Sequence, residues 1–291
     1  MLSQNDWIEE SLRIIATFSS VLRLYINQPA KKNIMRKYRI ITIAVLVIVF
    51  FGFVSSDFPF QEFRKNIESG KAKSVKTDIT FIAGKLNISA TSNLLCEGVY
   101  KYHRDYWKPE ISYNEDSQVG YLKIKVDDDR EEKKYDDSDN TEWNIALNKN
   151  IRNDLKVKML AGIGNIDMQS CKMDGLEFEM LAGEVKINLK NTSVPNLEFK
   201  ALTGEAEIDL SGKWENDLNA EIKGGVGELT IKLPSDIGIK LNITGGLGEV
   251  DAYGFSKHNK VYTNELYGKT KESLYLDISG GIGEVNIRMV D

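Results

Sequence analysis

Five glutamates that each follow a glycine turn are the residues of this chain best placed to do chemistry. They are Glu184, Glu205, Glu228, Glu249 and Glu284, with Asn165 at the head of the series. On stacked repeats they would form a column of carboxylates that could bind a cation or a cationic peptide. Like charges about 5 Å apart repel by up to about 3 kcal/mol at an effective dielectric of 20, so something must compensate. In the alternative interpretation, each carboxylate accepts the backbone N–H groups of its own turn and extends into water.

A repeated pair of strand-like segments, joined by a glycine turn, would position these carboxylates. The turn glycines are Gly84, in a weaker first copy, and Gly164, Gly183, Gly204, Gly227, Gly248 and Gly283. From Gly164 onward the intervals are 19, 21, 23, 21 and 35 residues, so the unit is about 21 residues and the last unit carries an insertion. Glycine suits such turns because it adopts positive φ at little cost, and a coil needs the same sharp corner in every turn.

Apolar residues occupy every second position on both sides of each turn. Leu197 and Phe199 precede one turn, and Ala206, Ile208 and Leu210 follow it. A period of two with one apolar face indicates half-buried strands and excludes helix. The pattern predicts an all-β fold, a single-stranded β-solenoid with rungs of about 21 residues, and a twisted meander of hairpins is the alternative.

The outward-facing charges favour the solenoid. Superposed on the repeat, Lys156, Glu177 and Glu198 share one position, and Lys158, Glu179, Lys200 and Glu221 share the next. The second series alternates in sign from unit to unit. Alternating signs are favourable between neighbours if the units stack in register at about 4.8 Å.

The N-terminal region predicts a membrane anchor. Ile40–Val54 has no charged residue, and the window of residues 39–58 approaches the roughly 20 residues that cross a bilayer. Five basic residues precede it, namely Lys31, Lys32, Arg36, Lys37 and Arg39. Basic residues stay in the cytoplasm, so we expect a single-pass protein with everything after Phe58 outside. A signal peptide cleaved near Val54 is the alternative.

Two further segments flank this anchor. Residues 1–38 would be cytoplasmic, with an amphipathic helix over residues 6–26 that could lie on the inner membrane surface or dock a partner. Met35 could instead be the true start of the chain. Residues 59–74 are charged and predict a helical linker.

The remaining chain divides into two parts, residues 75–150 and residues 151–291. The first holds a first rung at Ile79–Ser89 followed by short inserted strands, and the second holds the repeats. The acidic stretch Asp127–Asp139 predicts a solvated loop, because it lacks the spacing and the glycine of a calcium-binding EF-hand.

At this point a family resemblance can be stated. Two combinations, Trp107-Lys108-Pro109-Glu110 and Glu142-Trp143-Asn144, are followed by the glycine turns, and residues 75–189 resemble the bacterial toast-rack domain. The later rungs are similar to the C-terminal domain of LiaF-like cell-envelope stress proteins and to the putative-adhesin β-solenoids. The resemblance implies a membrane-associated envelope protein, sometimes regulatory, and supplies no catalytic residues. LiaF-like proteins usually have several membrane helices, whereas this chain has one predicted span.

The composition argues against most other classes of function. A net charge of −5 gives no indication of nucleic-acid binding. His103 and His258 are the only histidines, and Gly268-Lys269-Thr270 lacks the first glycine of a phosphate loop. We therefore expect no enzyme, no metal and no cofactor. Cys96 and Cys171 have no metal-like spacing, and whether they form a disulfide is left open.

Three functions remain. The first is a cell-envelope scaffold or interaction module that binds another membrane protein or a wall component. The second is a LiaF-like regulator of an envelope-stress sensor kinase, and the third is an adhesin. All three place the repeats outside the cytoplasm, on the cell membrane.

Overall fold

The computed structural model describes residues 60–126, 141–245 and 248–290. The predicted cytoplasmic segment, the predicted anchor and the acidic loop lie outside the described residues, so these three stay predictions. Within the described residues, no helix is both long and apolar enough to cross a membrane. The strands are β1 (Gln61–Ile67), β2 (Ser74–Phe81), β3 (Gly84–Ser92), β4 (Cys96–Tyr102), β5 (Pro109–Asp116), β6 (Val119–Val126), β7 (Thr141–Asn148), β8 (Arg152–Asp167), β9 (Met173–Asn188), β10 (Asn196–Asp209), β11 (Leu218–Pro234), β12 (Gly238–Gly245), β13 (Glu249–Ala252), β14 (Ser256–His258), β15 (Val261–Thr263), β16 (Ser273–Gly280) and β17 (Ile282–Val290). A single turn of 3-10 helix, η1 (Asp105–Trp107), follows β4.

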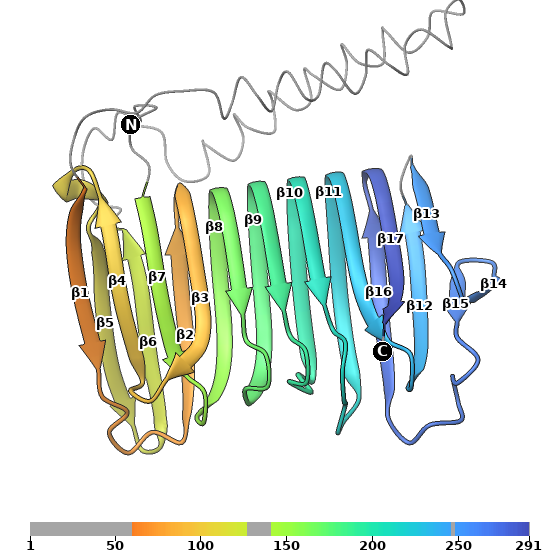
Figure 1. Ribbon diagram of the computed structural model, residues 1–291, viewed down its shortest axis with the longest axis horizontal. Helices are drawn as coiled ribbons and strands as arrows, with labels where there is room; N and C mark the ends of the chain where they lie inside the picture. Colours follow the sequence, from red (N-terminus) through yellow and green to blue (C-terminus); the bar gives the residue numbers. More distant parts are fainter. Residues whose placement is uncertain (1–59, 127–140, 246–247, 291) are drawn as a thin grey trace, which may run out of the picture. The chain divides into compact units, whose positions relative to one another are not determined.

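The middle of the molecule is a stack of four long strands, β8 to β11, each of which bends over at a glycine corner (Figure 1). Each strand therefore contributes to both walls of a flattened coil: the first wall precedes the corner and the second follows it. Neighbouring strands are parallel and in register, as in Phe199 against Phe178 on one side and Ile222 on the other. A meander of hairpins would be antiparallel. The all-β solenoid prediction is confirmed for these rungs.

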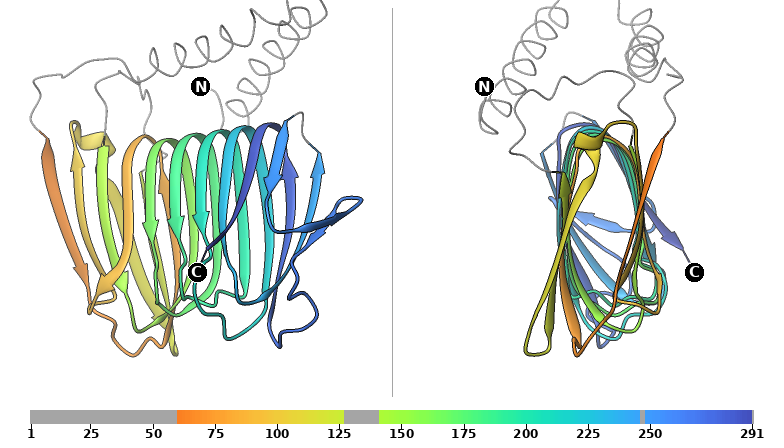
Figure 2. Two further views of the ribbon diagram at one scale, coloured as in Figure 1. Left: turned by 45° about the vertical axis from the view of Figure 1, so that its right-hand side comes forward. Right: turned by 90° about the vertical axis from the view of Figure 1, so that its left-hand side faces the viewer.

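At both ends, the order of rungs in the stack differs from their order in the sequence (Figure 2). The rung β2–β3 lies between β8 and a rung formed by β6 and β7. The rung β16–β17 lies between β11 and the rung β12–β13. The expectation that residues 90–150 interrupt the coil was wrong for β6 and β7, which continue it.

Antiparallel strands finish the two ends. On the N-terminal side, β5 pairs with β6, β4 with β7, and β1 with β4. On the C-terminal side, β15 pairs with β12, and β14 with β15. Short or charged edge strands of this kind limit the unpaired backbone that would otherwise recruit further chains.

The prediction of a helical linker over residues 59–74 was wrong for its first half. Residues Gln61–Ile67 form strand β1, which pairs with β4 from Gln61 opposite Tyr102 to Ile67 opposite Cys96. The ring of Phe63 lies 6.0 Å from that of Tyr100. Pairing with an available edge and burial of Ile67 outweigh the helical propensity of a charged segment, because local propensity contributes only tenths of a kcal/mol per residue.

Inward side chains from both walls form one continuous core. Phe178 and Phe199 stack with ring centroids 5.8 Å apart, and Phe199 is 0% exposed, which confirms the inward placement of this residue. Toward the N-terminal end, Trp143 packs edge-on against Phe81 and Tyr100.

The two cysteines are separate, buried and free. Burial raises the pKa of each thiol to about 12, so neither forms a reactive thiolate near neutral pH. The disulfide that the sequence left open is absent between them.

Candidate binding surface at the glycine corners

From the rung β2–β3 to the rung β12–β13, each corner is built around a glycine that lies directly on the glycine of the next rung. In stack order the column is Gly84, Gly162, Gly183, Gly204, Gly227, Gly283 and Gly248. A Cβ on each member after Gly84 would overlap the carbonyl oxygen of the glycine before it. For all but Gly248 the structure also records φ between 113° and 148°, a range that favours glycine. The corner edge is therefore set by close backbone approach as well as by backbone conformation.

One assignment from the sequence was wrong in this column. Gly164 pairs with Val185 on the second wall, and the corner glycine of its rung is Gly162. The interval to Gly183 is then 21 residues, equal to the next one. Ile163, rather than Asn165, precedes Glu184 at the glutamate position. Asn165 instead pairs with Lys186, and its amide donates to Asn87 Oδ1 at 3.0 Å.

The five glutamates do form a column on the second wall, immediately after the corners. Its order follows the stack: Glu184, Glu205, Glu228, Glu284 and Glu249. All five are exposed. Glu228 Oε1 accepts from Asn286 Nδ2 at 3.0 Å and from Thr230 Oγ1 at 3.3 Å, so its partners are side chains, not the N–H groups of its own turn.

What the column binds stays a prediction. In the part of the chain that the structure describes, no group of three or more histidine, cysteine, aspartate or glutamate side chains is arranged to hold a metal ion. The carboxylates are spaced along the stack and do not converge on one point. This geometry suits an elongated cationic partner better than a single ion.

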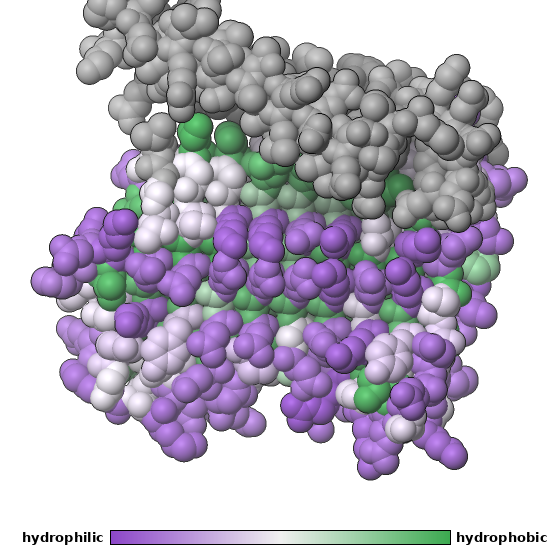
Figure 3. Space-filling view, turned by 180° about the vertical axis from the view of Figure 1, so that it is seen from behind, coloured by the Kyte–Doolittle hydropathy of each residue, from purple (hydrophilic) through white to green (hydrophobic). Residues whose placement is uncertain are grey.

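A line of large apolar side chains, missed by the sequence interpretation, runs along the outside of the corners. We call it the corner ridge: Leu160, Leu181, Leu202, Val226 and Ile282. The leucines each precede a paired residue of the same register, whereas Val226 pairs with Thr203 and with Ile282, one position further along the rung. Four members are 39% to 48% exposed and Leu202 is half-buried. Each ridge residue has a small neighbour at the corner. Alanine or threonine follows each of the three leucines, and glycine precedes Val226 and Ile282. Each of these five rungs thus places one bulky apolar group outward, and Figure 3 shows hydrophobic side chains along this edge where it is in view.

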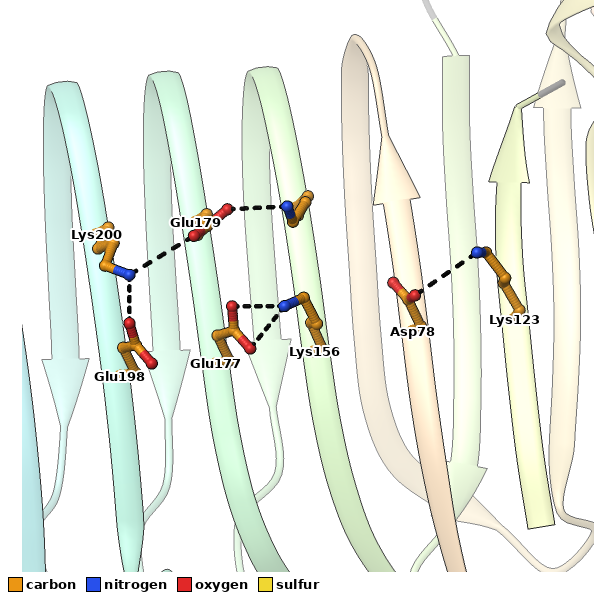
Figure 4. Close-up of polar contacts among 8 residues, drawn as sticks. Asp78, Lys123, Lys156, Glu177, Glu179, Glu198 and Lys200 are labelled. Atoms are coloured by element: carbon orange, nitrogen blue, oxygen red, sulfur yellow. Dashed lines mark hydrogen bonds and ion pairs between the residues drawn. The ribbon is translucent and has the colours of Figure 1, made fainter. Parts of the chain in front are cut away.

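The first wall carries two ladders of charge that cross the strands (Figure 4). Lys156 Nζ lies 2.7 Å from Glu177 Oε1, and Lys158 Nζ lies 3.3 Å from Glu179 Oε2. Lys200 bridges to Glu179 at 3.7 Å and to Glu198 on its own strand. The hydrogen bond from Lys200 lowers the pKa of Glu198, and the one to Glu177 raises the pKa of Lys156.

The ladder predicted from the sequence contained one misplaced residue. Glu221 pairs with Glu198, and Lys223 pairs with Lys200, so the sign alternation of the second ladder ends at Lys200. The interval of 23 residues between Gly204 and Gly227 explains the error, because the two extra residues lie in the loop before β11. Lys223 compensates Glu221 along the strand instead.

A small cavity lies beneath the corners toward the C-terminal end. The side chain at the last inward position before the corner becomes smaller along the stack. In stack order this position holds Phe81, Met159, Met180, Ala201, Gly224, Gly280 and Gly245. The space left by the missing side chains has a volume of about 40 Å³, and glycines and apolar residues dominate its lining. It is too small and too apolar to act as a site for a polar ligand.

Comparison with known proteins agrees with this geometry. The N-terminal domain of toast_rack, DUF2154, matches residues 57–200 and 175–232. The crystal structure of a "putative cell adhesion protein" from Clostridium sporogenes ATCC 15579 shares 31% identity with a TM-score of 0.63, covering 80% of this chain and 100% of that one. A "putative adhesin" from Parabacteroides distasonis ATCC 8503 shares 9% identity with a TM-score of 0.27, covering 79% and 98%, a likeness too low to carry an argument. No curated protein matches the chain.

Proposed function

Since the chain belongs to the toast-rack family, we propose that it is a membrane-anchored, extracytoplasmic β-solenoid that acts as a non-catalytic interaction module of the cell envelope. One observation carries the proposal. The fold repeats one rung along an axis, and each repeat presents the same kinds of side chain at the same places. Such a stack suits binding of an extended macromolecule, because successive rungs offer successive contacts.

The partner we propose is another membrane protein or a wall component. Support comes from the two walls, which carry charged outward side chains over several rungs. The Clostridium relative, a "putative cell adhesion protein", gives further support. The anchor at residues 39–58 is proposed from the apolar sequence and the basic residues before it. Regulation of a sensor kinase has no specific support in the described residues, and the experiment below keeps it as an outcome.

Photo-crosslinking in cells tests the proposal. Tyr121 and Tyr275 are both exposed on the first wall, on β6 and β16, so benzoylphenylalanine can replace either without entering the core. We expect crosslinks to an envelope partner from these positions and none from Phe199, which is buried. Recovery of a histidine kinase would favour the regulatory function, and recovery of cell-wall material would favour the scaffold. The proposal would be contradicted if correctly localised protein gave no crosslink specific to Tyr121 or Tyr275.

A further inference from the structure

The chain enters the coil at the edge that carries the corner ridge. Gly84, a corner glycine, pairs with Thr141, and Glu142 next to it pairs with Lys101. Gln61 pairs with Tyr102, the residue after Lys101. The first residue of β1 therefore lies level with the corners, and Figure 1 shows β1 beginning at the edge where β8 to β11 bend over.

Little chain separates this edge from the proposed membrane anchor. The anchor is proposed to end at Phe58, and β1 begins at Gln61. Three residues of extended chain reach at most about 10 Å. The beginning of β1 must then lie within that distance of the membrane boundary.

We propose that the corner ridge lies against the surface of the lipid bilayer, with the stack axis parallel to the membrane plane; this rests on the proposed anchor. The ridge crosses five rungs and is therefore about 19 Å long at a rung spacing of about 4.8 Å. Contact along that length holds both walls upright and directs the opposite loop edge away from the membrane. The exposed walls then face laterally, where other membrane proteins are.

The neighbours of the ridge set how deep it goes. Four glutamates lie two or three residues beyond the ridge positions on the same rungs, namely Glu184, Glu205, Glu228 and Glu284. Charged side chains are costly in hydrocarbon. The ridge therefore touches the boundary between headgroups and acyl chains and does not insert. Phe60, which is 48% exposed and stacks on His103 with centroids 3.9 Å apart, adds an aromatic contact of the kind found at membrane interfaces.

The contact need not be strong. A domain tethered by a short linker has an effective concentration at the bilayer in the millimolar range, so a weak patch suffices to orient it. Ridge side chains that are already half in contact with their own rung lose little freedom on docking.

Lipid-dependent quenching in the full-length protein tests the contact. Leu181→Cys, on the ridge, and Lys213→Cys, exposed on the loop edge, each carry the fluorophore NBD in vesicles of phosphatidylcholine and phosphatidylglycerol. Cys96 and Cys171 are buried and leave a low labelling background. Headgroup spin-labelled lipid is expected to quench Leu181→Cys several-fold more than Lys213→Cys. Equal quenching at both positions would overturn the proposal.

Alkaline carbonate extraction of the same samples separates the two proposals. If the protein resists extraction but Leu181→Cys is not quenched, the anchor holds and the ridge contact fails. If the protein is extracted, the anchor fails and the ridge proposal fails with it. An NBD emission at Leu181→Cys that is blue-shifted but insensitive to lipid would also overturn the proposal. Disulfide-linked dimers of the unlabelled Leu181→Cys variant, formed on oxidation by copper phenanthroline, would then identify a second copy as the occupant. Loss of that blue shift on removing residues 1–34 would identify the chain's own N-terminal segment.

Discussion

The middle of the stack and its two ends differ in how their strands pair and in the order of their rungs. Between β8 and β11, each rung lies on its sequence neighbour, the strands are parallel, and one glycine forms each corner. At the ends, a later or earlier rung is inserted out of order and antiparallel strands finish the sheet. The middle is therefore specified by repetition, and each end by contacts that occur once. We expect substitutions in the middle to act through the shared columns, with effects that spread to neighbouring rungs.

The largest effect is expected for Phe199→Asp in the middle of the core. An unpaired carboxylate would replace a ring that is 0% exposed and stacked on Phe178, at a cost of several kcal/mol. Phe199→Leu, the matched control, keeps the site apolar and should lose much less. Urea unfolding of the purified protein measures both. Unchanged stability in Phe199→Asp would mean that the rungs do not pack as described.

A second large effect separates two glycines only two positions apart. The Cβ of Gly162→Ala would overlap the backbone carbonyl of Gly84, and φ at Gly162 itself is 121°, so the corner must open. The Cβ of Gly164→Ala would lie 3.1 Å from a methyl of Val185 and 3.2 Å from the sulfur of Met159, both on side chains that can adjust. The melting temperature should fall far more for Gly162→Ala. The reverse order would restore Gly164 as the corner.

A smaller and pH-dependent effect is expected on the first wall. Lys200 lowers the pKa of Glu198, and a lowered pKa in the folded state adds stability above the unfolded pKa that is lost as pH falls through the folded value. Lys200→Met should therefore cost about 0.2–1 kcal/mol at neutral pH, the range of exposed ion pairs, and less in acid. Unfolding at both pH values, with Glu198→Gln and the double variant completing the cycle, measures the coupling. An equal cost of Lys200→Met in acid would assign its effect to packing.

The smallest effect is expected in the glutamate column. Replacing Glu205, Glu228 and Glu284, three consecutive members, by glutamine keeps an acceptor oxygen for Asn286 and removes mutual repulsion. Stability should stay level or rise slightly, more visibly at low salt, where screening is weak. Millimolar Ca²⁺ or Mg²⁺ should not raise the melting temperature of the parent. A metal-dependent rise that the triple variant lacks would instead assign a cation to the column.

The same contrast explains what the sequence could predict. Period-two alternation and recurring glycines occur four times in the middle, so they identified the coil, the inward position of Phe199 and the glutamate column. Errors arose where a rung departs from the average. Gly162 and Gly164 both lie in one turn, and only the pairing of Gly162 with Gly183 distinguishes them. The insertion of β16–β17 beside β11 could not be found, because equivalent rungs offer equivalent edges and the sequence does not order them.

Topology in living cells tests the central claim, an interaction module held outside the cytoplasm, most directly. Fusions of alkaline phosphatase and of a green fluorescent protein after Asp291 report the side on which the chain ends, since the phosphatase is active only outside and the fluorescent protein folds inside. Five basic residues before the apolar segment predict an active phosphatase and a dark fluorescent fusion in the membrane fraction. An inactive phosphatase with a fluorescent partner would contradict the account.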